Sequence, residues 1–179
     1  MAEITVHLPV YNGVGFLDET PQSLRQQSFA DFEVLCIDDC SDDGSADVIQ
    51  RHAALNERII YLHTGRNLGS APRAVNFAAQ QTKGWWFASS SQDDLFSQDW
   101  FARLHQRVLA TGADAVLPDL VFYHADSPSG GRKIAGYCTG ATGLPFCRGR
   151  RPSMPRWTRQ FPAMRSGRHP FSKRTALMI

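Results

Sequence analysis

The chain has 179 residues, of which 42% are hydrophobic and 11% aromatic, enough for one domain with a packed core but short for two. No run approaches the roughly 18 apolar residues of a membrane-spanning helix, and no basic stretch precedes an apolar one at the N-terminus, so we expect a soluble, unexported protein. The four cysteines, Cys36, Cys40, Cys138 and Cys147, show no paired C-x-x-C spacing, which disfavours zinc and favours a reducing compartment.

The net charge of +2 hides a sharp division along the chain. Residues 1–126 carry all 17 acidic side chains and 8 of the 19 basic ones, a balance of −9. Residues 127–179 carry 11 basic side chains and no acidic one, and they begin with the linker-like sequence SPSGG. We therefore predict a folded domain over 1–126 and an irregular, poorly ordered, Arg-rich tail over 127–179.

Apolar runs and amphipathic segments alternate along the first 126 residues. The predicted strands are 4–10, 32–37, 58–63, 85–90 and an extended segment at 114–124 that Pro118 interrupts; the predicted helices are 15–27, 45–55, 70–81 and 98–110. This alternation, with short connections, predicts an α/β fold with a mainly parallel sheet and helices on both faces. In such folds ligands bind at the carboxyl ends of the strands.

Acidic residues gather at two of these predicted strand ends. CIDDCSDDGS (36–45) holds four aspartates within six residues, and SSSQDDLFSQDW (89–100) holds a second acidic pair. Two carboxylates ~4 Å apart repel by on the order of 4 kcal/mol at an effective dielectric of about 20. A bound cation or a donor-rich ligand would relieve this repulsion, and hard oxygen ligands suit Mg²⁺ or Mn²⁺.

Four segments in register resemble the nucleotide-binding half of the family-two glycosyltransferases, which have the GT-A fold. They are HLPVYNG at the first strand, VLCIDDCSDDGS at the second, TGRNLGSAPRAVNFAAQQTKG before the fourth strand, and WWFASSSQDDLFSQDW in place of the family's DXD segment. The resemblance runs from about Ile4 to His124, roughly two-thirds of the chain.

The resemblance implies roles for particular residues. The donor nucleotide would be bound by Pro9, Val10, Tyr11, Asn12, Asp39, Arg73 and Gln92, and the metal by Asp93 and Asp94. Asp39 would accept a hydrogen bond from a uracil-type N–H, because a carboxylate accepts and cannot donate. Asp93 would hold the diphosphate through the ion, with Asp94 in support. Tyr11 would pack against the base, and Arg73 would contact a phosphate.

The sequence departs from the family pattern at the DXD segment. Ser91 replaces the first aspartate, so the metal site has one carboxylate fewer, and Ser91 or Gln92 would contact the ribose instead. The remaining aspartates have structural explanations: Asp42 and Asp43 precede a predicted helix, where negative charge is favoured, and Asp38 points away from Asp39 by strand alternation.

The resemblance implies an inverting glycosyltransferase that moves a sugar from a nucleotide-diphosphate donor to a cell-surface polysaccharide or glycolipid. We expect the donor to be UDP-linked. We expect it in the cytoplasm at the inner face of the membrane, with a glycan or lipid-linked acceptor and no nucleic-acid partner. The general base that such a transfer requires is not identified, because no carboxylate side chain follows Asp126. Either the tail docks on an anionic surface such as membrane lipid or nucleic acid or, as we favour, the chain is a truncated or out-of-frame form of a longer transferase.

Two other functions stay open. A nucleotidyltransferase would need a basic loop near the first strand to hold a triphosphate, and LPVYNGVGF contains no Lys or Arg. A non-catalytic nucleotide-binding or scaffold domain with a basic tail is the other alternative. Slow hydrolysis of a donor sugar without acceptor would separate the enzyme from this scaffold.

Overall fold

The structure is a computed structural model that describes residues 2–116, 121–124, 133–137 and 176–178. Its helices are α1 (Glu19–Arg25), α2 (Ser45–Leu55), α3 (Ala71–Ala78), the 3₁₀ turn η1 (Ala79–Gln81) and α4 (Trp100–Thr111). Its strands are β1 (Ile4–Val10), β2 (Phe32–Asp38), β3 (Ile59–His63), β4 (Trp86–Ser89), β5 (Ala115–Val116), β6 (Val121–His124), β7 (Lys133–Tyr137) and β8 (Ala176–Met178). No helix in these ranges is long and apolar enough to cross a membrane.

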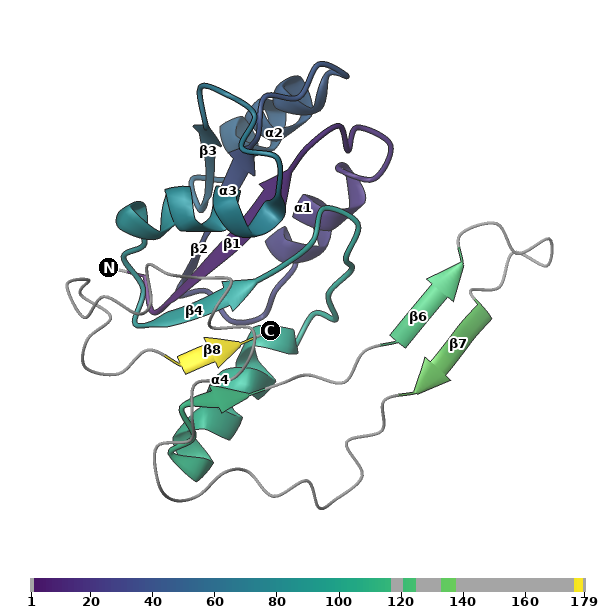
Figure 1. Cartoon of the computed structure of the whole chain (residues 1–179). Helices are drawn as coiled ribbons and strands as arrows, with labels where there is room; N and C mark the ends of the chain where they lie inside the picture. Colours follow the sequence, from purple (N-terminus) through teal and green to yellow (C-terminus); the bar gives the residue numbers. More distant parts are fainter. Residues whose placement is uncertain (1, 117–120, 125–132, 138–175, 179) are drawn as a thin grey trace.

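Six strands form one sheet in the order β3-β2-β1-β4-β8-β5 (Figure 1). Every neighbouring pair in it is parallel. The carboxyl ends of β1, β2 and β4 therefore meet at the same edge, and this edge carries the loops with the acidic residues. The prediction of a mainly parallel sheet is confirmed.

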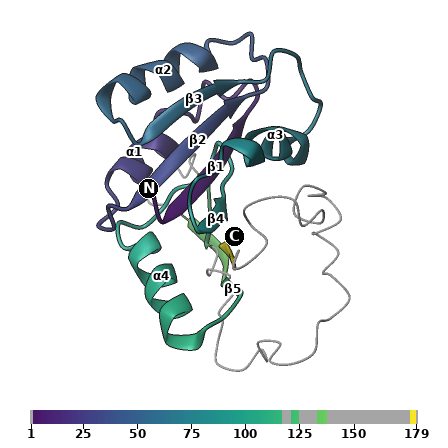
Figure 2. The same cartoon turned by 90° about the vertical axis from the view of Figure 1, so that its left-hand side faces the viewer.

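Helices cover both faces of the sheet. Apolar residues of α1, α2 and α4 pack with one set of alternating strand residues, among them Val6, Val34 and Cys36. Ala74 and Ala78 of α3 pack with Leu35 and Ile37, which point to the opposite face. Figure 2 shows α1, α2 and α4 on one side of the sheet and α3 on the other. The sheet is buried on both faces, as the continuous apolar runs of β1 and β2 predict.

The predicted and observed elements differ mainly at their ends. The first helix was expected from residue 15, yet α1 begins at Glu19, because residues 13–18 form turns in which Phe16 and Leu17 both donate to the carbonyl of Gly13. The segment 114–124 divides into β5 and β6, with Pro118 outside the described residues.

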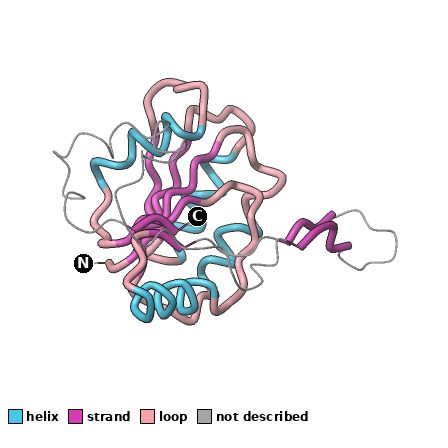
Figure 3. The backbone as a smooth tube through the Cα atoms, turned by 60° about the horizontal axis from the view of Figure 1, so that its bottom comes forward, coloured by secondary structure: helices cyan, strands magenta, loops and turns pink. Residues whose placement is uncertain are grey.

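Two further strands fall in the segment for which the sequence shows no periodicity. Strand β7 pairs antiparallel with β6, and this two-stranded ribbon lies apart from the main sheet (Figure 3). Strand β8 lies in the main sheet between β4 and β5. Most of the predicted tail lies outside the described residues, and the domain boundary at Asp126 stays a prediction.

Candidate functional site

The loop after β1 is bonded to the loop after β2. The backbone N–H of Asn12 donates to Ser41 Oγ at 3.1 Å, and that of Gly13 donates to Ser45 Oγ at 2.9 Å. In return, the Asn12 side-chain oxygen accepts the N–H of Asp42 at 3.0 Å. Asn12 has a positive φ of 49°, a conformation that asparagine tolerates better than most residues. The β1 and β2 strand ends therefore form one connected surface.

The loop after β4 is bonded to the same β1 loop. The Gln92 side-chain amide accepts from the N–H of Tyr11 at 2.9 Å and donates to the Tyr11 carbonyl at 3.3 Å. The Gln92 backbone carbonyl accepts from the hydroxyl of Thr20 at 2.8 Å. Since the loops bearing Asp39 and Asp93 both join residues 11–13, the structure brings the two predicted acidic sites to one edge.

Asp38 is a structural residue, as predicted. Only 1% of its surface is exposed. Its carboxylate accepts from the Ser41 N–H at 3.0 Å and from the Tyr61 hydroxyl at 3.1 Å. These bonds fix the turn that follows β2 and join it to β3.

Asp39 lies beside Asp38 and organises a different loop. Its Oδ1 accepts from the Thr64 hydroxyl at 3.1 Å and from the Leu68 N–H at 2.7 Å, while its Oδ2 accepts from the Gly69 N–H at 3.3 Å. An ionised carboxylate offers about four lone-pair positions. One position on Oδ2 is thus left without a donor, and 4% of the Asp39 surface is exposed.

Arg73 holds the same loop from its other side. Its guanidinium donates to the Leu68 carbonyl at 3.0 Å, and the residue is exposed at the start of α3. This contact keeps Arg73 next to the segment that Asp39 orders. No sequence pattern points to Thr64 and Leu68, because their role depends on a backbone turn and not on a recognisable motif.

Asp43 fastens the first turn of α2 to the β1 loop. Its carboxylate accepts from the Val14 N–H at 2.9 Å and from the Ser45 N–H at 3.0 Å. Desolvation acts to raise its pKa, but hydrogen bonds from Ser45 and Val14 outweigh this and hold the pKa below its usual value. The predicted helix-capping role therefore holds for the Ser45 N–H, although Gly44 takes the N-cap position. Asp42 is exposed and offers its N–H to Asn12.

The three residues predicted to line the base pocket differ in exposure. Tyr11 is 51% exposed at the strand end, and Pro9 is half-buried. Val10 has 1% of its surface exposed and packs in the core, so at this edge it contributes its backbone, whose carbonyl accepts the Asp39 N–H at 2.8 Å.

The acidic pair after β4 is exposed. Asp94 accepts the Ser91 N–H at 2.8 Å, which closes a tight turn and presents the neighbouring Asp93 to solvent. The pKa of Asp94 is raised above its usual value, mainly by desolvation. The hydrogen bond from the Ser91 N–H lowers this pKa, and the negative charge of Asp93 raises it. A cation bound at this turn would relieve the repulsion between the two carboxylates.

A metal ion at this edge would need ligands beyond the described side chains as well. Across the residues the structure describes, no group of three or more His, Cys, Asp or Glu side chains is placed to hold an ion. Mg²⁺ usually keeps several waters and binds through one or two carboxylates together with substrate phosphates. Asp93 and Asp94 fit that kind of site.

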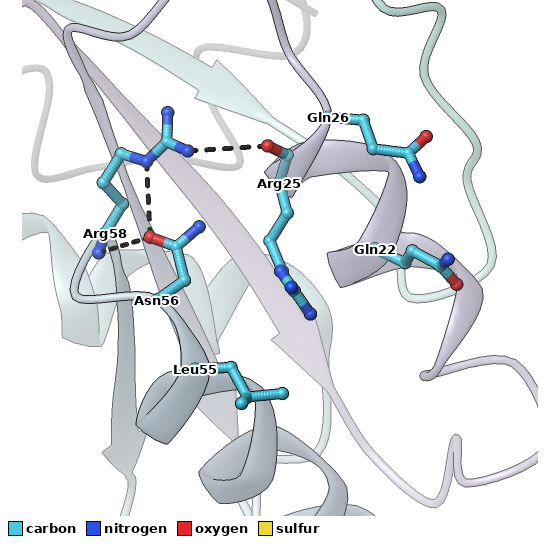
Figure 4. Close-up of a pocket in the computed structure, with 6 residues that line it drawn as sticks. All are labelled: Gln22, Arg25, Gln26, Leu55, Asn56 and Arg58. Atoms are coloured by element: carbon cyan, nitrogen blue, oxygen red, sulfur yellow. Dashed lines mark hydrogen bonds between the residues drawn. The ribbon is translucent and has the colours of Figure 1, made fainter.

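A separate cavity of about 410 Å³ lies at the opposite edge of the sheet. It is lined by Gln22, Arg25, Gln26, Leu55, Asn56 and Arg58, from the ends of α1 and α2 and the start of β3 (Figure 4). Arg58 donates to the Asn56 side-chain oxygen at 3.3 Å and to the Arg25 carbonyl at 3.5 Å. These contacts satisfy carbonyl groups near a helix end, and the cavity contains none of the predicted site residues.

A parallel sheet with helices on both faces and acidic loops joined at the strand ends defines the GT-A-like class of α/β domains. The chain belongs to glycosyl transferase family 2, whose family model matches residues 5–169. The predicted family and fold are therefore confirmed.

Curated relatives match part of the chain. It is 32% identical over 96 residues to the putative teichuronic acid biosynthesis glycosyltransferase TuaG of Bacillus subtilis, covering 54% of this chain and 38% of TuaG. It is 27% identical over 144 residues to glycosyltransferase GlyG of Streptococcus pneumoniae, covering 80% of this chain and 45% of GlyG. The matched part is thus less than half the length of either relative.

Solved structures share the fold. Staphylococcus aureus TarS in complex with UDP matches with a TM-score of 0.60 at 22% identity, covering 65% of this chain and 35% of that one. The mannosyltransferase PcManGT of Pyrobaculum calidifontis, in complex with GDP-Man and Mn²⁺, matches with a TM-score of 0.57 at 22% identity, covering 62% and 33%. At this level of identity the likeness concerns the fold.

Proposed function

We propose that this chain supplies the nucleotide-sugar-binding part of an inverting glycosyltransferase that uses a UDP-linked donor with Mg²⁺ or Mn²⁺. One observation carries the proposal: the loop bearing Asp39 and the loop bearing Asp93 are both hydrogen-bonded to residues 11–13 at the carboxyl edge of the sheet. A nucleoside diphosphate has a base at one end and anionic oxygens at the other. The edge offers a hydrogen-bond acceptor for the first and metal ligands for the second.

Each end of the donor has a chemical counterpart among these residues. The remaining lone pair of Asp39 Oδ2 would accept the ring N–H of uracil, and the exposed ring of Tyr11, at the end of β1, would pack against the base. Asp93 and Asp94 would hold the metal ion that bridges the diphosphate, and Arg73 would approach a phosphate from the loop it supports. The ion would neutralise the charge that develops on the leaving nucleoside diphosphate.

The relatives' names suggest the kind of acceptor. TuaG is named for teichuronic acid biosynthesis, and TarS is a poly(ribitol-phosphate) β-N-acetylglucosaminyltransferase. By analogy, we propose transfer to a cell-surface polysaccharide or glycolipid; the location at the inner face of the membrane stays a prediction from the sequence. The general base would come from outside the described residues or from a partner.

Calorimetric titration of the full chain with UDP in the presence of Mn²⁺ tests the proposal. We expect binding by the wild type, a loss of affinity when Mn²⁺ is replaced by EDTA, and at least tenfold weaker binding by Asp93→Asn. Arg107→Gln, on the exposed face of α4, is the control and should bind as the wild type does. UDP binding that is indifferent to both Mn²⁺ and Asp93 would refute the metal-bridged site.

A further inference from the structure

The contact between Gln92 and Tyr11 has an unusual form. One side-chain amide pairs with both backbone groups of a single residue, accepting from the Tyr11 N–H at 2.9 Å and donating to the Tyr11 carbonyl at 3.3 Å. Two strands of a sheet bond to each other with the same pair of groups. The Gln92 side chain therefore imitates a neighbouring strand.

This contact takes over where the strand pairing ends. The register of β1 and β4 runs from Ile4 opposite Trp86 to His7 opposite Ser89, and one more bond joins the Ser90 N–H to the His7 carbonyl. Beyond this point the segment after β4 separates from β1, which continues to Val10 before its own loop begins. Gln92 bridges the gap and fixes how far Tyr11 lies from the acidic turn that follows.

The space around the amide is closed on the side of Gly13. A Cβ atom added to Gly13 would lie 2.5 Å from Gln92 Cδ and 2.6 Å from its Oε1, far closer than real Cβ atoms approach other atoms. Gly13 is itself buried, with its N–H bonded to Ser45. A glycine at this position is thus a condition for the amide to reach Tyr11.

We infer that Gln92 is a positioning residue that sets the spacing between the base-binding end and the metal-binding end of the site, and that its amide is not the contact to the ribose. The inference rests on the proposed function, in which Tyr11 and Asp93 hold opposite ends of one nucleotide. A ligand that spans both ends depends on the spacing. A ligand that occupies the base-binding end alone depends on it far less.

Two substitutions remove the contact from opposite sides. Gln92→Ala deletes the amide, and Gly13→Ala displaces it while leaving the glutamine in place. Their controls are Gln26→Ala, at an exposed glutamine beyond the end of α1, and Gly15→Ala, where an added Cβ meets nothing within 4 Å. All four are made in the full chain and titrated with UDP plus Mn²⁺ by calorimetry and with uridine by NMR.

We expect Gln92→Ala and Gly13→Ala each to weaken UDP–Mn²⁺ binding about tenfold, because the ligand must then order a loop that has lost two hydrogen bonds. We expect each to weaken uridine binding less than twofold. The double variant should be no weaker than either single one, because both changes act through the same amide. The controls should bind as the wild type does. Equal losses for UDP and uridine would show instead a contact to the nucleoside and overturn the inference, as would additive losses in the double variant.

Hydrogen exchange at the Tyr11 amide gives a readout that needs no nucleotide. Its protection should fall in both variants and stay unchanged in the controls. If the wild type binds UDP and neither protection nor the UDP-to-uridine affinity ratio changes in the variants, the positioning role is wrong while the proposed function stands. If the wild type binds no UDP, the proposed function and the positioning role both fail, whatever the exchange shows.

Discussion

His7 makes folding sensitive to mild acid. It lies in the middle of β1 with 1% of its surface exposed, its ring edge-on to Phe87 at 4.6 Å and its Nε2 2.6 Å from the Thr82 hydroxyl. Its Nδ1 is buried without a hydrogen-bond partner. Burial lowers the pKa of His7 from 6.5 to about 3, because a charged imidazole there would lose its hydration without gaining a compensating charge.

The direction of the pH effect follows from proton binding. In the unfolded chain His7 takes up a proton below about pH 6.5, whereas in the folded chain it stays neutral down to about pH 3. The unfolded state therefore gains protons first, and stability falls as the pH drops through this window. The expected loss relative to pH 7 is about 2 kcal/mol at pH 5 and about 3 kcal/mol at pH 4. The value at pH 5 depends almost entirely on the unfolded pKa, provided that the folded pKa lies below about 4.

Urea denaturation followed by tryptophan fluorescence at pH 7 and pH 5 measures this loss. His7→Gln removes the titrating group and keeps a polar side chain for Thr82, so the wild type should lose about 2 kcal/mol more than His7→Gln between the two pH values. His63→Gln, at an exposed position, is the control and should follow the wild type. Equal losses in the wild type and His7→Gln would refute the argument that burial keeps His7 neutral.

Three further predictions concern the loops and the base. Gly84→Ala should lower the free energy of unfolding by about 1–3 kcal/mol in urea titrations, because the added Cβ would lie 2.6 Å from the backbone nitrogen of Thr5. A stability equal to that of Gly15→Ala would contradict this. Asp43→Ala should cost about 1–2 kcal/mol at pH 7 by thermal denaturation, since the N–H groups of Val14 and Ser45 lose their acceptor; an unchanged Tm would count against that role. UDP should bind the wild type at least tenfold more tightly than CDP in calorimetry, because cytosine presents no ring N–H to Asp39, and equal affinities would remove this contact.

The sequence was informative wherever structure is determined locally. The mainly apolar run at 4–10 and the amphipathic segment at 45–55 predict β1 and α2 with their observed bounds. Parallel order then follows from the alternation of strands and helices, and it places both acidic segments at one edge without any knowledge of their contacts.

The contacts inside the edge could not be predicted in the same way. They depend on loop backbones with uncommon conformations, such as the positive φ of Asn12 and of Cys40, and on partners far apart in the chain. The family pattern leaves Ser91 or Gln92 for the ribose, and it carries no signal that the Gln92 amide bonds the backbone of Tyr11, 81 residues away. The order that Asp39 imposes on Leu68 and Gly69 likewise has no local signature.

The proposed function requires that a metal ion and a nucleoside diphosphate bind together at the carboxyl edge of the sheet. Paramagnetic broadening by Mn²⁺ in the amide spectrum of the full chain locates the ion directly. With UDP present, we expect the Gly13 and Ser91 signals to disappear at Mn²⁺ levels that leave the Arg25 and Asn56 signals, from the cavity at the opposite edge, intact. Broadening centred on Arg25 and Asn56, or broadening of the Gly13 and Ser91 signals that is the same without UDP, would contradict it.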